Sequence, residues 1–146
     1  MPMFHARSRH DLRSAYLAAW RKAQAGDTLT PLEAQIAQVV AEHPEYHPML
    51  EGPPEVLEAQ FPPEAGAENP FLHLGLHLAV REQVSTDRPP GIARIHSRLS
   101  ARLGSAHVAE HRMFEVLGRL LWEAERAGQA PDESTYLEQL QRLMPD

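Results

Sequence analysis

The chain has 146 residues, a formal net charge of −6 at pH 7, nine histidines and no cysteine. Its length predicts one domain over residues 1–146, and the missing cysteine excludes disulfides, iron–sulfur clusters and Cys-ligated zinc. The acidic balance argues against a nucleic-acid partner. The longest mostly apolar stretch, residues 71–80, is shorter than the roughly 20 residues that span a bilayer, and no secretory signal pattern is visible. We therefore expect a cytoplasmic protein, a monomer or homodimer, without a membrane partner.

Two amphipathic helices are predicted near the N-terminus. Apolar residues recur with helical spacing over residues 12–23, and Gly26 can end that helix in the left-handed conformation. The segment Thr30-Pro31-Leu32-Glu33 has the pattern of a capping box with proline at the first helical position. The helix that it opens should end by His43, because the residue before Pro44 is biased away from the α region.

The rest of the chain is predicted to form a loop and further helices. Residues 44–66 are rich in proline and glutamate, so we expect a loop or flap there, with at most a short helix near residues 54–59. No alternation of apolar and polar residues is long enough to predict a β-sheet. Helices are expected over residues 70–85, 92–103, 106–126 and after residue 132. The fold class is all-α: a helical bundle with four main helices, short helices and one long Pro-rich loop.

The histidines show a regular spacing. Four residues bring two side chains onto one face of a helix, where two imidazoles can reach a common metal ion. Glu115 extends the last pair to His-x-x-x-His-x-x-x-Glu, an array of ligands like those in bundle-core metal sites. Pro44 interrupts the first pair, which should lie at a helix end and the following turn. With Glu115, the predicted metal ligands are the pairs His43 and His47, His73 and His77, and His107 and His111.

Other polar residues are weaker candidates. A buried histidine on a helix is often only a hydrogen-bonded core residue, but two pairs on separate helices favour metal binding, because burying imidazoles without partners is costly. Glu45 or Tyr46 could add a ligand to the first pair, and Glu82 could support the second. The unpaired histidines are expected on the surface: His5, His10 and His96.

Several segments together have the pattern of a known family: Trp20-Arg21-Lys22, residues 29–33, 42–47, 69–78 and 88–92, and the helix from His107 to Trp122. They resemble one bacterial family, the domain of unknown function 1841, and the resemblance covers nearly the whole chain. The family pattern contains the three histidine pairs and a glutamate at Glu115, whereas the cysteine that often follows this glutamate is Val116 here. The resemblance supports the histidine set and implies no activity. At the level of fold, the ligand style is also similar to hemerythrin-like four-helix bundles.

Three functions remain open at this point. The first is a dinuclear non-haem centre in the bundle core, bridged by Glu115, with iron preferred and zinc, manganese or nickel as alternatives. It would carry out O₂ or peroxide chemistry on iron, or hydrolysis on zinc. The second function is a single structural zinc site of His73, His77, His107 and His111. The third function is a non-metal interaction protein with a pH-sensitive polar core. No catalytic residue or substrate is identified, and whether the protein is an enzyme stays open.

Overall fold

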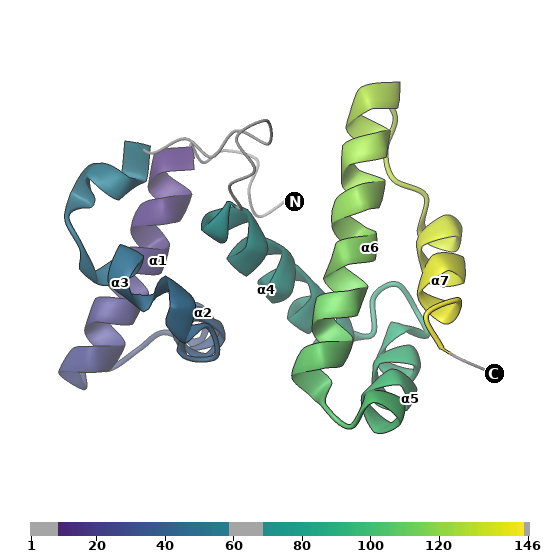
Figure 1. Cartoon of the computed structure of the whole chain (residues 1–146), viewed down its shortest axis with the longest axis horizontal. Coiled ribbons are helices and arrows are strands. Elements are labelled where there is room, and N and C mark those ends of the chain that lie inside the picture. Colours follow the sequence, from purple (N-terminus) through teal and green to yellow (C-terminus); the bar gives the residue numbers. More distant parts are fainter. Residues whose placement is uncertain (1–8, 59–68, 145–146) are drawn as a thin grey trace. The chain divides into compact units, whose positions relative to one another are not determined.

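Every regular element in the part of the chain that the structure describes, residues 9–58 and 69–144 of a computed structural model, is a helix (Figure 1). This confirms the all-α fold class. The chain divides into two compact units, residues 1–74 (unit 1) and residues 75–146 (unit 2). Helix α4 (Pro70–Thr86) begins in unit 1 and continues in unit 2. None of the described helices is long and apolar enough to cross a membrane.

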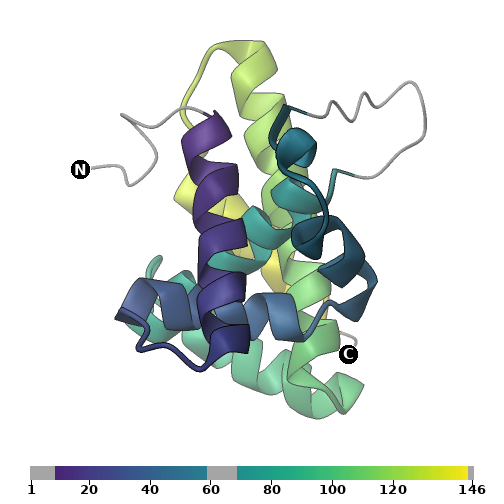
Figure 2. The ribbon, with the colours of Figure 1, turned by 90° about the vertical axis from the view of Figure 1, so that its left-hand side faces the viewer.

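Unit 1 is built on α1 (Arg9–Ala25) and α2 (Pro31–Ala41), which pack against each other (Figure 2). The predicted capping box is present: the Thr30 hydroxyl accepts from the Glu33 backbone N–H, and the Glu33 carboxylate accepts from the Thr30 N–H. Residues that bury their side chains recur three or four positions apart, as the amphipathic patterns require. The unit 1 core contains Tyr16, Leu17, Ala19, Ile36, Val39, Val40 and Leu50.

The prediction of a loop over residues 44–66 is wrong for its first part, which forms η1 (Pro44–Tyr46) and α3 (His47–Glu51). The short helix expected near residues 54–59 is present as η2 (Pro54–Glu58). Proline starts η1 and η2 and is the second residue of α3. A helix needs no N–H from its first turn, so proline is tolerated there and here marks helix starts rather than a loop. Residues 59–66 of the predicted loop lie outside the described residues.

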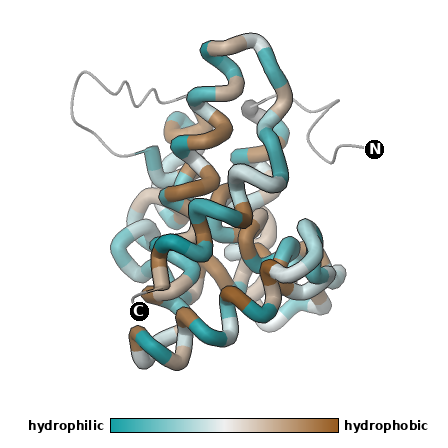
Figure 3. The backbone as a smooth tube through the Cα atoms, turned by 90° about the vertical axis from the view of Figure 1, so that its right-hand side faces the viewer, coloured by the Kyte–Doolittle hydropathy of each residue, from teal (hydrophilic) through white to brown (hydrophobic). Residues whose placement is uncertain are grey.

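Unit 2 contains the rest of α4 with α5 (Ile92–Leu103), α6 (Ala106–Ala127) and α7 (Glu133–Gln141). Helix α6 packs against α5 and α7, and hydrophobic (brown) and hydrophilic (teal) residues alternate along the backbone of this unit (Figure 3). Gly104 and Gly128 end α5 and α6 in the left-handed conformation, with φ of 75° and 67°. These helix bounds agree with the sequence prediction, because caps and glycine stops are local signals.

One close approach in unit 2 depends on a glycine. A Cβ added at Gly118 of α6 would lie 3.1 Å from Leu76 Cδ1 of α4. The missing side chain lets the two helices come close at this level. Around this contact lies the unit 2 core, which includes Val80, Ile95, Leu99, Met113, Phe114, Leu117 and Leu140.

Candidate metal centre

Three histidine rings lie together in unit 2. Helix α4 supplies His77, which is fully buried, and α6 supplies His107 and His111, which are partly buried. The ring centroids of His107 and His111 lie 4.4 Å apart, and those of His77 lie 5.3 Å and 5.4 Å from them. A ring nitrogen of His77 lies within 4.8 Å of one on His111 in one group of possible ligands, and within 4.8 Å of one on His107 in a second group. Two imidazole nitrogens on a tetrahedral zinc ion are about 3.3 Å apart, so small side-chain movements would let the rings share an ion. We call these residues the unit 2 cluster.

A buried carboxylate from α6 supports the unit 2 cluster. Glu110 is only 6% exposed. Its Oε1 accepts from His77 Nε2 at 2.7 Å and from Arg81 Nε at 3.0 Å, and its Oε2 accepts from His96 Nε2 at 2.9 Å. Donors from α4 and α5 therefore satisfy both oxygens of this carboxylate, as a buried charge requires.

The electrostatics of this contact determine which groups are charged. Burial raises the pKa of Glu110, but hydrogen bonds from His77 and His96 and the Arg81 charge outweigh it, and the pKa falls below its ordinary range. Burial lowers the pKa of His77 more than the Glu110 contact raises it. At neutral pH Glu110 is thus ionised and His77 is neutral. An ionised carboxylate only accepts, so the His77 proton sits on Nε2 and the lone pair on Nδ1.

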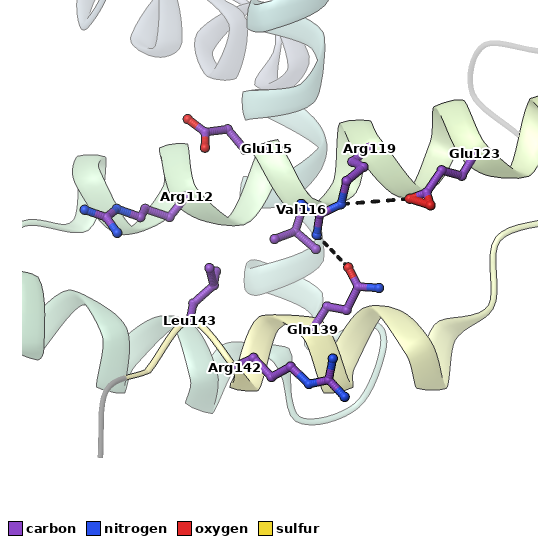
Figure 4. Close-up of a pocket in the computed structure, with 8 residues that line it drawn as sticks. All are labelled: Arg112, Glu115, Val116, Arg119, Glu123, Gln139, Arg142 and Leu143. Carbon is purple, nitrogen blue, oxygen red and sulfur yellow. Dashed lines mark hydrogen bonds and ion pairs between the residues drawn. The ribbon is translucent and has the colours of Figure 1, made fainter.

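The structure places Glu115 elsewhere than the spacing predicts. Glu115 is exposed on α6 and lines a groove between α6 and α7 with Arg112 and Arg119 (Figure 4). The carboxylate that contacts His77 is Glu110, which sequence reasoning missed. A signal was available, because Glu110 precedes the buried residue Met113 by three positions and is therefore a charged residue on the apolar face of its helix.

The prediction that His96 is a surface residue is wrong. Its side chain is 18% exposed and donates to Glu110. It follows Ile92 by four positions and precedes Leu99 by three, which places it on the edge of the apolar face of α5. Of the other unpaired histidines, His5 lies outside the described residues, and the backbone of His10 lies in α1.

Unit 1 brings a different pair of histidines together. His43 is fully buried in the turn after α2, and its Nε2 lies 3.0 Å from Nε2 of His73 on α4. His43 Nδ1 lies 2.8 Å from the backbone oxygen of Val39. A carbonyl only accepts, so His43 Nδ1 donates and its Nε2 carries the lone pair. Metal-binding histidines usually donate their second ring N–H to a carbonyl or carboxylate in this way. We call His43 and His73 the unit 1 cluster.

Tyr46 contacts the unit 1 cluster, whereas His47 packs elsewhere in unit 1. The Tyr46 ring is buried and stacks on His43 with centroids 5.6 Å apart. His47 begins α3; its ring packs on Trp20 with centroids 4.5 Å apart, and its Nε2 donates to the backbone oxygen of Val40 at 2.8 Å. The first pair was expected at a helix end and the following turn; the structure places His43 in the turn after α2 and His47 at the start of α3. The two weaker carboxylate candidates, Glu45 and Glu82, are exposed.

The described part of the chain therefore contains groups of histidines that could bind metal. A model of the family described as "Domain of unknown function (DUF1841)" matches residues 8–142. No curated protein and no solved structure matches the chain. The similarity to hemerythrin-like bundles stays a prediction. The match over nearly the whole chain confirms the family resemblance, and the chain belongs to the family of domain of unknown function 1841.

Proposed function

We propose that this protein binds divalent metal ions through its two histidine clusters. One ion is held in unit 2 by His77, His107 and His111, and a second ion is held in unit 1 by His43 and His73. The observation that carries the proposal is the mutual contact of three imidazole rings in unit 2, next to a buried carboxylate that orients one of them.

The chemistry of the donors supports this proposal over a purely structural polar core. Neutral imidazole is the form that ligates metal, and burial keeps His77 in that form. The Glu110–His77 contact has the arrangement of a carboxylate–histidine–metal triad. Helix α4 supplies one histidine to each cluster, His73 and His77, so both ions depend on the same helix.

The donor sets favour iron or zinc among the common metals. They contain imidazole nitrogen and no thiolate, which suits iron, zinc, copper and nickel, whereas magnesium and manganese prefer more oxygen ligands. Three histidines leave at least one coordination position open in a catalytic site. Bound iron would supply O₂ or peroxide chemistry and bound zinc would activate water. Iron remains the preferred metal for these histidine sites.

The test is the metal content of untagged protein, prepared both aerobically and anaerobically and measured by elemental analysis. We expect about two ions per chain from the ligand count. His77→Ala should remove the unit 2 ion and His43→Ala the unit 1 ion, while the exposed α6 residue in Glu125→Gln serves as the control. Protein without stoichiometric metal in both preparations would overturn the proposal. Metal that survives in His77→Ala and His43→Ala alike would overturn the ligand assignment.

A further inference from the structure

We propose that Glu110 is a positioning residue that selects Nδ1 of His77 as the metal-binding atom, with His96 and Arg81 holding the Glu110 carboxylate in place. The inference rests on the proposed metal site in unit 2 and names a part of it that the ligand spacing does not indicate. It starts from a geometric observation: one buried carboxylate receives hydrogen bonds from three side chains.

The hydrogen-bond directions determine the tautomer of His77. A neutral imidazole carries its proton on either ring nitrogen, and the two forms present the lone pair on different sides of the ring. His77 Nε2 lies 2.7 Å from Glu110 Oε1. Because the carboxylate can only accept, the proton is held on Nε2 and the lone pair on Nδ1. Charge-assisted bonds of this kind are roughly twice as strong as neutral ones, so the preference for this tautomer is large.

The other two contacts keep the carboxylate from turning away. His96 from α5 donates to Oε2 and Arg81 from α4 donates to Oε1. The carboxylate and the His77 ring are both buried, so water cannot easily replace either partner. Histidine ligands in metal sites are commonly oriented by an outer carboxylate, and loss of such a partner typically lowers metal affinity roughly 10- to 100-fold.

Glu110 lies on the same helix as two of the proposed metal ligands. Glu110 immediately precedes His111 on α6, the helix that also bears His107. One helix therefore supplies two ligands and also orients the third ligand, which comes from α4. A shift of α6 along its axis would move both ligands and the positioning carboxylate together.

The experiment compares Glu110→Gln with Glu115→Gln, the same chemical change five residues along the same helix at an exposed site. The first readout needs no metal: long-range proton–nitrogen NMR of nitrogen-15-labelled apo protein reports which nitrogen of His77 is protonated. We expect the Nε2–H form in wild type and Glu115→Gln, and loss of that preference in Glu110→Gln. The second readout is Zn²⁺ affinity by competition with a chelator, expected to fall roughly 10- to 100-fold only in Glu110→Gln.

The outcomes separate the inference from the proposed function. A wild-type protein that binds no Zn²⁺ refutes the metal site itself and the inference with it. A wild-type protein that binds Zn²⁺ with His77 in the Nδ1–H form, or a folded Glu110→Gln variant of unchanged affinity, refutes the role of Glu110 alone. If circular dichroism shows Glu110→Gln to be unfolded, His96→Ala replaces it, because that variant leaves the Glu110–His77 bond and only loosens the carboxylate. It should lower Zn²⁺ affinity several-fold, and unchanged affinity would refute the inference.

Discussion

His73 Nε2 lies 3.0 Å from His43 Nε2, although the two residues belong to different pairs in the sequence. Each has its own partner four residues away, His47 for His43 and His77 for His73. In the structure His47 instead packs on Trp20, and His77 joins the unit 2 cluster. The regular spacing thus selected the candidate histidines, but it did not predict which histidine contacts which. Of the three pairs, the one at His107 and His111 lies with both rings in one cluster.

Removing metal should lower the thermal stability of the protein. Ions that bind only the folded state add RT ln(1 + [L]/Kd), about 2.7 kcal/mol when the ion is at 100 times its Kd. Differential scanning calorimetry with and without a strong chelator should therefore show a lower Tm in the chelated sample, and His111→Ala should reduce both metal content and this difference. A Tm that chelation leaves unchanged would contradict the metal site.

His96→Ala should destabilise the protein even without metal. The substitution leaves Oε2 of the buried Glu110 carboxylate without its donor, and such a loss costs about 1 to 3 kcal/mol. Urea unfolding of apo protein measures the change. The matched control is Arg94→Ala, at an exposed position two residues earlier on α5, which should change stability by less than about 0.5 kcal/mol. Equal stability of the two variants would show that the Glu110–His96 contact contributes nothing.

The stability of variants at Gly118 should depend steeply on the size of the new side chain. Alanine gains about 1 kcal/mol of helix propensity but places a Cβ 3.1 Å from Leu76 Cδ1, so the two effects nearly cancel. Leucine cannot fit between α4 and α6 without moving them and should cost about 1 to 3 kcal/mol. Urea unfolding of both variants tests this expectation. A leucine variant as stable as wild type would mean that the helices separate there at no cost.

The N-terminus of α7 should loosen in acid. Hydrogen bonds from the side chain and backbone N–H of Thr135 lower the pKa of Asp132, the N-cap residue, below its ordinary value. The ionised cap therefore contributes its full stability above that ordinary value, and the contribution is lost as the pH falls through the lowered pKa. Amide exchange in the first turn of α7, followed between pH 5 and pH 2 (about the range of carboxylate titration), should accelerate relative to the rest of unit 2. Asp132→Asn keeps a capping oxygen and should abolish this relative change; the same acceleration in that variant would exclude Asp132 as its source.

The sequence by itself determined the local features of this protein. The capping box at Thr30, the glycine stops at Gly104 and Gly128, and the start of α4 at Pro70 each depend on residues within one or two turns, so their patterns predicted the helix bounds. The helical class and the histidine residues of interest follow from the same short-range periodicity.

Only the tertiary structure decided which groups meet. Glu110 and His77 are 33 residues apart, and Glu110 and His96 are 14 apart on different helices, so no local pattern relates them. Helical spacing favoured Glu115, because it follows His111 by one turn, yet α6 turns Glu110 toward α4 and α5 and leaves Glu115 exposed. A helix shows one face to its neighbours, and which face that is depends on how its whole apolar stripe packs. The ligand partners of a site between helices are therefore decided by packing, after the helices themselves have been specified by their own residues.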